Sequence, residues 1–134
     1  MIPEDRYYTK CHQWVKIDEA IVQLGVTAPI LRKLGPLVGI ELPEHDDEMK
    51  EELAFGELEG MEETFELYPP FEARVAEAHE ELVWDPERLE KDPYGKGWLL
   101  KIRVHAPQDI KRLLTAHAYR EFCIGDLGDE FVDD

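Results

Sequence analysis

The sequence predicts a mainly β protein, an antiparallel sandwich or barrel-like domain with helices at its periphery. Many short runs alternate or cluster apolar residues as strands do, and Gly, Pro and charged residues separate these runs. Apolar residues recur at helical spacing in only two places, after residue 27 and after residue 107. The length of 134 residues fits one domain, residues 1–134.

The first elements are two strands and a short helix. Residues 12–17 and 20–26 are predicted as strands joined by a tight turn, because apolar side chains dominate both and two acidic residues separate them. Thr27 is the expected cap of a helix of one or two turns, which has a proline in its first turn. Gly35 and Pro36 are expected to end this helix.

The middle of the chain is predicted to form a strand, a charged loop and a hairpin. Residues 37–42 are apolar enough for a strand, whereas residues 44–52 are too charged to lie in a core and are predicted as a loop or turn. Residues 53–58 and 64–68 flank a polar segment, so we expect a hairpin with its tip near residues 60–63.

The last third is predicted to contain two strands and a C-terminal helix. Residues 71–75 alternate with a period of two, and residues 99–104 form an apolar strand; a connection with several Pro and Gly residues lies between them. The helix is expected from Pro107, with its stop at Gly125 and an acidic tail beyond. Its apolar positions are Ile110, Leu113, Leu114, Ala118 and Phe122.

The charge balance narrows the classes of partner. The chain has 31 acidic and 15 basic residues, a formal net charge of -16. The electrostatic field of this negative charge repels nucleic acid and anionic membranes, and it favours encounter with a protein that presents a basic face. The alternative is that the charge serves solubility alone.

The thiols and the ends of the sequence indicate the compartment. Cys11 and Cys123 are two isolated cysteines, which is typical of free thiols in a reducing environment. No targeting segment or membrane-length apolar run is visible. We therefore expect a cytoplasmic protein.

Three stretches, in a fixed order and spacing, carry a resemblance to a known family: residues 8–15 (YTKCHQWV), 38–43 (VGIELP) and 92–99 (DPYGKGWL). With them, nearly the whole chain resembles the glycine cleavage system H protein. The resemblance implies a lipoyl-domain-like fold, a barrel-sandwich hybrid of antiparallel strands. It also implies a hairpin that exposes one lysine carrying lipoate, and a protein that is a carrier and not an enzyme.

This sequence departs from the family at the residue that carries the cofactor. When the hairpin is aligned without gaps, the family's attachment lysine falls on Glu62. A carboxylate cannot be the amine that attacks an activated lipoate, so we expect no cofactor there. Residues 51–90 contain no lysine at all. Modification of another lysine, such as Lys50, Lys91 or Lys96, is the alternative.

The former attachment turn is predicted to face a protein partner. Residues 41–66 contain twelve acidic residues and one basic residue, which concentrates negative charge there. The alternative is a solvated face without a partner. The expected partners are glycine cleavage or lipoate-handling enzymes, with the reuse of the fold as an unrelated interaction module as a further alternative. The residues of this turn are Glu59, Gly60, Met61, Glu62 and Glu63.

Other combinations of residues do not indicate a catalytic or metal site. The consecutive residues 45–48 contain possible metal ligands, but adjacent side chains do not converge on one ion. Cys11 and His12 are neighbours expected to point to opposite faces of a strand. The chain contains no serine and no phosphate-binding glycine loop, so no catalytic residues are predicted. The three tryptophans are expected in the core: Trp14, Trp84 and Trp98.

Overall fold

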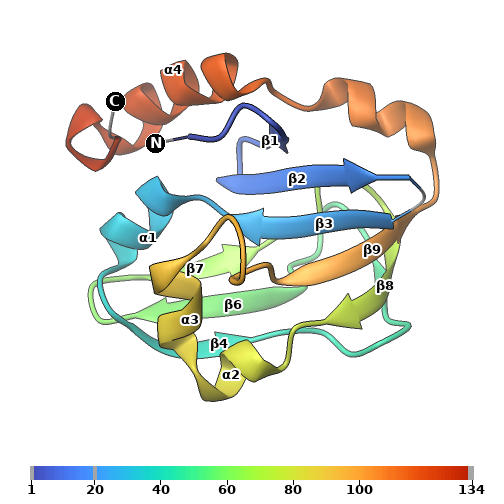
Figure 1. Ribbon diagram of the computed structural model, residues 1–134, viewed down its shortest axis with the longest axis horizontal. Coiled ribbons are helices and arrows are strands. Elements are labelled where there is room, and N and C mark those ends of the chain that lie inside the picture. Colours follow the sequence, from blue (N-terminus) through green and yellow to red (C-terminus); the bar gives the residue numbers. More distant parts are fainter. Residues whose placement is uncertain (1, 20, 133–134) are drawn as a thin grey trace.

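Two antiparallel sheets pack face to face in the computed structural model (Figure 1). It describes residues 2–19 and 21–132, and for residues 107–109 the backbone alone. Within these ranges, six strands form one sheet in the order β1-β2-β3-β9-β8-β5, and three form the other in the order β4-β6-β7. The first sheet contains β1 (Tyr7–Tyr8), β2 (Gln13–Asp18), β3 (Ile21–Val26), β9 (Leu100–Val104), β8 (Ala73–Ala78) and β5 (Glu48–Met49), and the second contains β4 (Leu37–Glu41), β6 (Gly56–Gly60) and β7 (Thr64–Leu67). This arrangement confirms the mainly β, antiparallel prediction.

Helices lie around the sheets (Figure 1). The longest, α4, runs along the edge of the six-stranded sheet beside β1. The short α2 and α3 pack against β4. The helical segments are α1 (Ala28–Leu34), α2 (Glu81–Trp84), α3 (Pro86–Lys91), α4 (Ala116–Leu127) and two 3-10 turns, Pro107–Arg112 and Asp129–Phe131.

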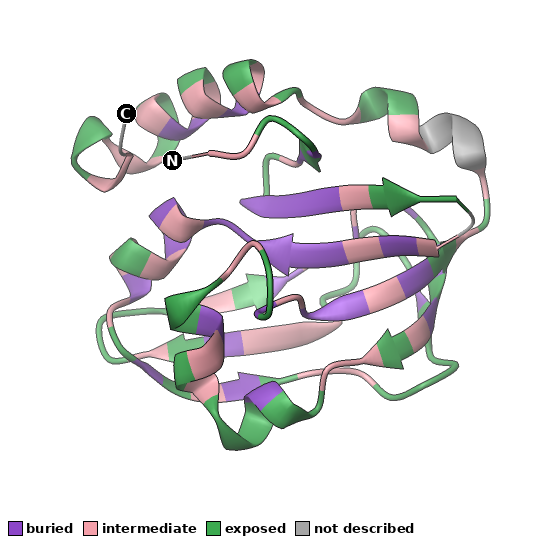
Figure 2. Ribbon diagram, in the orientation of Figure 1, coloured by how far each residue is buried: buried purple, intermediate pink, exposed green. Residues whose placement is uncertain are grey.

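The main core fills the space between the two sheets (Figure 2). Val15 and Leu24 of the large sheet and Leu58 of the small one are completely buried there. Each fully buried aliphatic side chain contributes about 1.5–3 kcal/mol relative to exposure. Gln13 ties β2 to the chain after β7 through both of its amide atoms: Nε2 donates to the Tyr68 carbonyl over 2.7 Å, and Oε1 accepts from the Tyr68 N–H over 3.1 Å.

A second buried cluster lies between β2 and α4, on the opposite face of β2 from the main core. Trp14 is completely buried in it, and its indole N–H donates to the Pro93 carbonyl over 2.9 Å. Gly25 lies opposite Trp14 in the β2–β3 register, and a Cβ at Gly25 would lie 2.3 Å from the indole ring. The rings of Tyr8 and Tyr119 stack with centroids 4.9 Å apart, which holds α4 on this face.

The strands and the short helix of the first half confirm the prediction, with two corrections. Thr27 precedes α1 but its side chain makes no cap bond, because its hydroxyl lies 2.7 Å from the Tyr119 hydroxyl. The charged segment 44–52 contains the short strand β5, which pairs with β8. Only Met49 of this strand is buried, so the composition gave little signal for it.

The predicted C-terminal helix begins too early and stops too early. Leu114 is extended and exchanges two backbone hydrogen bonds of 2.8 Å with Tyr8, which separates the 3-10 turn before it from α4. The helix starts after Thr115, whose hydroxyl accepts the Ala118 N–H. Gly125 lies inside α4; Gly128, with φ of 104°, ends it. Of the predicted acidic tail, residues 133–134 lie outside the described residues.

Two further predictions for the second half were wrong. The connection between β8 and β9 contains α2 and α3, which the sequence pattern missed because both are shorter than two turns. Trp84 at the end of α2 is 86% exposed, so it is not a core residue, whereas Trp98 packs against the second cluster. His79 stacks on Trp98 with ring centroids 4.1 Å apart.

Candidate functional site at a hairpin tip

The predicted partner-facing turn is the tip of the hairpin formed by β6 and β7. Glu59 pairs with Thr64 in the strand register, and the Gly60 N–H donates to the Glu63 carbonyl over 2.9 Å. The hairpin prediction is thereby confirmed, but the first strand begins and ends later than expected, and the second begins at the expected residue and ends one residue earlier. The structure brings all five predicted turn residues together at one end of the small sheet, where the loop projects at the left edge of Figure 1.

Backbone hydrogen bonds fasten this tip to the C-terminal end of α1. The Met61 N–H donates to the Pro36 carbonyl and the Glu62 N–H to the Leu34 carbonyl, both over 2.9 Å. These bonds need a close approach of the two chains. A Cβ on Gly60 would lie 2.2 Å from the Leu34 carbonyl oxygen, and one on Gly35 would lie 2.7 Å from Cγ of Glu62. A side chain at Gly60 would therefore force the two backbone segments apart, whereas one at Gly35 would force the exposed Glu62 side chain to shift.

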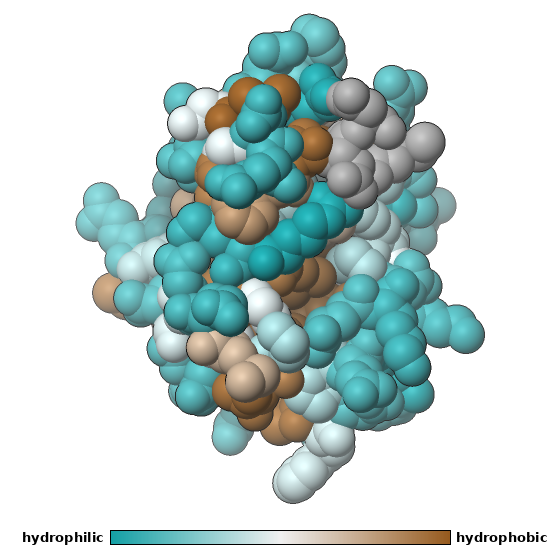
Figure 3. All heavy atoms as spheres, turned by 90° about the vertical axis from the view of Figure 1, so that its left-hand side faces the viewer, coloured by the Kyte–Doolittle hydropathy of each residue, from teal (hydrophilic) through white to brown (hydrophobic). Residues whose placement is uncertain are grey.

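The side chains at the tip are displayed to solvent. Met61 is 69% exposed, and Glu59, Glu62 and Glu63 are exposed as well. Figure 3 views the molecule from the side on which the tip projects, and shows a mostly hydrophilic face with small, separate hydrophobic patches. An exposed thioether among carboxylates suits contact with a partner that carries both apolar and basic groups.

An ion pair joins the tip to α1. The Lys33 ammonium lies 2.8 and 2.6 Å from the two carboxylate oxygens of Glu63. This contact could not be predicted from a local pattern, because the two residues are 30 positions apart. The last turn of α1 also carries Arg32, so basic residues stand where the negative end of the helix dipole favours them.

A buried network of polar side chains links the turn before β2 and the start of α1 to α4. His12 adopts φ of 57°, and its Nδ1 lies 2.8 Å from the Tyr119 hydroxyl, while Nε2 lies 2.7 Å from the Asp126 carboxylate. Since Asp126 accepts, neutral His12 donates from Nε2 and accepts from Tyr119, which in turn accepts from Thr27. The His12 ring also lies 6.5 Å from that of Phe65.

Burial controls the protonation of His12 and Tyr119 in this network. It lowers the pKa of His12, against the opposing effect of the hydrogen bond to Asp126. Burial also raises the pKa of Tyr119, which therefore stays protonated. This network could not be predicted from the sequence, since His12 and Asp126 are 114 positions apart. The prediction that Cys11 and His12 lie on a strand was wrong: they lie in a turn, with Cys11 exposed and His12 buried.

The chemistry available at the tip is that of carboxylates and a thioether. Attachment of lipoate through an amide requires a primary amine, which Glu62 does not have, so the residue at the tip does not fit this group. The amine of Lys33 is nearby but is engaged by Glu63. In residues 2–19 and 21–132, no group of three or more His, Cys, Asp or Glu side chains is arranged to hold a metal ion.

None of the helices in the described ranges combines the length and the apolar character needed to cross a bilayer.

Comparisons with known proteins connect the hairpin and the fold to one family. A family model described as Glycine cleavage H-protein matches residues 6–125. A glycine cleavage system H protein from Crocosphaera subtropica is 39% identical over 127 residues, 94% of this chain and 96% of the relative. One from Staphylococcus epidermidis is 38% identical over 120 residues, 90% of this chain and 95% of the relative.

A solved structure supports the same assignment. The crystal structure of a glycine cleavage system H protein from Mycobacterium marinum superposes with a TM-score of 0.82 at 32% identity. The match covers 90% of this chain and 97% of that one. The lipoyl-domain-like fold predicted from the resemblance is thereby confirmed.

Proposed function

The chain belongs to the glycine cleavage H-protein family, and from this membership we propose that it is a member without lipoate at the family position. Members of this family are carriers and not catalysts, and this chain is not an enzyme. We propose that it acts as a binding or regulatory partner of glycine cleavage or lipoate-handling enzymes in the cytoplasm.

The observation that carries the proposal is the position of Glu62. It lies at the exposed end of the hairpin, in a backbone setting that main-chain hydrogen bonds hold in place. The presenting structure is therefore kept, while the group presented is a carboxylate. A surface with a retained shape and changed chemistry supports a role in docking, because docking needs no covalent cofactor.

The main test is the intact mass after co-expression with a lipoate ligase in the presence of lipoate. The native chain is compared with Glu62→Lys and with the double variant Glu62→Lys, Glu63→Ala. We expect no mass gain for the native chain and little for the single variant, because Glu63 and Phe65 alter the turn that a ligase recognises. The double variant should gain more, since it also removes the carboxylate beside the new lysine.

Each result separates the alternatives. Efficient modification of the single variant would show that the neighbouring residues do not matter to the ligase. A gain of one lipoyl group on the native chain would overturn the proposal and revive the carrier function. Lys33 is then the residue to map first, because its amine is at the tip. If the mass gain disappears in Lys33→Arg but persists in the control Lys91→Arg, Lys33 is the modified residue.

Binding to purified partners tests the second part. The native chain is immobilised and offered the glycine cleavage enzymes and a lipoate ligase, one at a time. At least one should bind, and Met61→Ser should weaken that binding, whereas Ile17→Ser, an exposed apolar control on β2 of the other sheet, should not. If none of these enzymes binds, the fold serves an unrelated interaction.

A further inference from the structure

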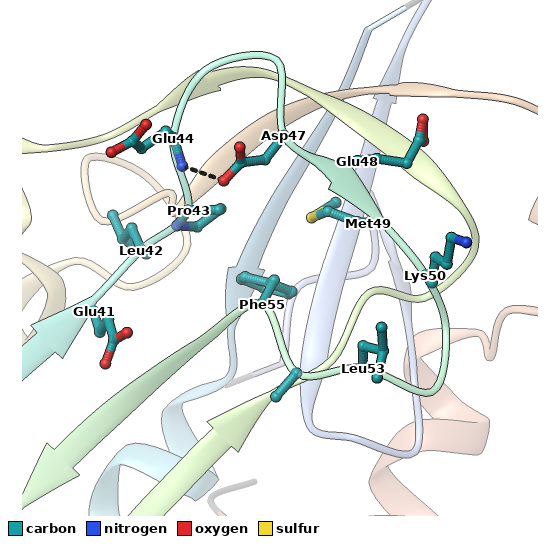
Figure 4. A pocket seen from close by; sticks show the side chains of 11 residues that line it. Glu41, Leu42, Pro43, Glu44, Asp47, Glu48, Met49, Lys50, Leu53 and Phe55 are labelled. Carbon is teal, nitrogen blue, oxygen red and sulfur yellow. Dashed lines mark hydrogen bonds between the residues drawn. The ribbon is translucent and has the colours of Figure 1, made fainter.

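A groove lies at the opposite end of the hairpin from the tip, where β4 leaves the small sheet and β5 joins the large one (Figure 4). Its volume is about 450 Å³. The strand β6 begins beside the groove and ends at the tip. Five residues of β-strand span about 17 Å, so the groove is separate from the hairpin tip.

The walls of the groove are held by hydrogen bonds within the fold. In one wall the Glu44 N–H donates to the Asp47 carboxylate over 2.9 Å, the contact drawn in Figure 4. Val75 of β8 fixes the same loop, because its N–H donates to the Asp47 carbonyl and its carbonyl accepts from the Asp46 N–H, both over 2.9 Å. A preformed groove loses little conformational entropy on binding.

Apolar side chains form the floor of the groove. Met49 is 3% exposed and points between the walls, and Leu42 and Phe55 are half-buried. Leu53 stands at the edge and is 64% exposed. The floor therefore continues the hydrophobic core outward to an apolar residue at the surface.

The rim is acidic. Four carboxylates and one ammonium line it: Glu41, Glu44, Asp47, Glu48 and Lys50. In the part of the chain that the structure describes, neither Glu41 nor Glu44 has an ion-pair partner.

One rim carboxylate is already paired. Glu48 lies 2.6 Å from Nε2 of His105 and 3.2 Å from Arg74, and the hydrogen bond with His105 lowers its pKa. The remaining negative charge of the rim is thus available to a ligand.

We propose that this groove binds an extended segment of a partner protein in which arginine or lysine residues alternate with leucine or another aliphatic residue. The aliphatic side chain packs on Phe55 and Leu53, above the buried Met49, and the cationic side chain lies between Glu41 and Glu44. The occupant follows from charge complementarity: the apolar floor alone accepts many ligands, but the rim excludes acidic ones. A second copy of this chain does not fit, because its net charge is -16.

The test uses the full chain and the peptide acetyl-Gly-Leu-Arg-Leu-Arg-Gly-amide, with binding followed by fluorescence anisotropy and by amide shifts in NMR. Glu41→Gln with Glu44→Gln should weaken binding about five- to tenfold, since each exposed ion pair contributes up to about 1 kcal/mol. The control, Glu87→Gln with Glu121→Gln, removes the same charge at distant exposed positions and should leave affinity within about twofold.

A second pair of variants tests the apolar floor. Leu53→Ser should weaken binding of the peptide. Val38→Ser changes a residue of similar exposure that lies outside the groove, and it should leave the binding unchanged. Amide shifts are expected in residues 41–55. If both double charge variants lose the same affinity for the peptide, the attraction is non-specific and the proposal is overturned. Amide shifts confined to residues 59–63 would overturn it as well. Neither result bears on the lipoylation test, which reads the hairpin tip alone.

Discussion

Gly35 ends α1 with φ of +75° and lies directly beside the Glu62 side chain. Residues other than glycine rarely adopt this conformation, and a side chain here would also meet Cγ of Glu62. Both effects act on the same contact, the one that seats the hairpin tip on the helix. Gly125, by contrast, lies in the last turn of α4, and a Cβ there would meet no atom within 4 Å.

These two glycines make a matched pair of substitutions. Gly35→Ala should lower the free energy of unfolding by about 1–2 kcal/mol, because of the strained φ. Gly125→Ala should raise it by up to about 1 kcal/mol, because alanine favours an open helix position. Urea denaturation measures both. Equal stability of the Gly35→Ala variant and the native chain would show that the turn relaxes at no cost.

A buried imidazole adds to the contacts that attach α4 to the sheets. His12 connects Tyr119 and Asp126 of this helix to the turn before β2, and its side chain is only 4% exposed. The groups that face it include Asp126, which stabilises a charged ring, and Lys33, which opposes it. Desolvation outweighs the carboxylate, so the folded protein favours the neutral ring.

Stability should therefore fall in mild acid. The pKa of His12 is lower in the folded chain than its ordinary value of 6.5, so the unfolded chain binds a proton first as the pH drops. The contribution of His12 is fully present above pH 6.5 and is lost progressively below it. Urea midpoints measured from pH 8 to pH 5 should decline for the native chain more steeply than for His12→Asn, which tolerates the positive φ. Parallel curves would contradict this.

At the level of elements, local signals predicted some features and could not predict others. The alternation in β2 and the turn residues of the hairpin are local, so both were predicted. The break before α4 arises from the pairing of Leu114 with Tyr8, which no helical period reveals. In the same way Lys33 meets Glu63 only after α1 and the hairpin pack together, so the sequence located the tip without its ion pair.

For the whole molecule, the charge of -16 opposes compaction. The pairs Arg74 with Glu48 and Arg112 with Glu51 neutralise only part of the acidic surface. Exposed pairs contribute little each, so they do not cancel the repulsion among the remaining carboxylates.

Salt should therefore stabilise the fold. Raising the ionic strength from about 0.01 M to about 0.1 M shortens the screening length from about 30 Å to about 10 Å. The urea midpoint of the native chain should rise over this range. A variant with Glu41, Glu44 and Glu52 changed to Gln should show a smaller rise. A midpoint that falls with salt would mean that ion pairs outweigh repulsion.

The main-chain bonds from Leu34 and Pro36 to the tip have an evolutionary consequence. Because these bonds use only main-chain atoms, they fix the backbone position of residue 62 and place no requirement on the identity of its side chain. A single nucleotide change converts a lysine codon into a glutamate codon, so the charge at this position can change while the backbone of the turn stays in place. A carrier needs both an amine at residue 62 and a turn that suits a modifying enzyme, whereas the placement of the turn needs only these main-chain bonds.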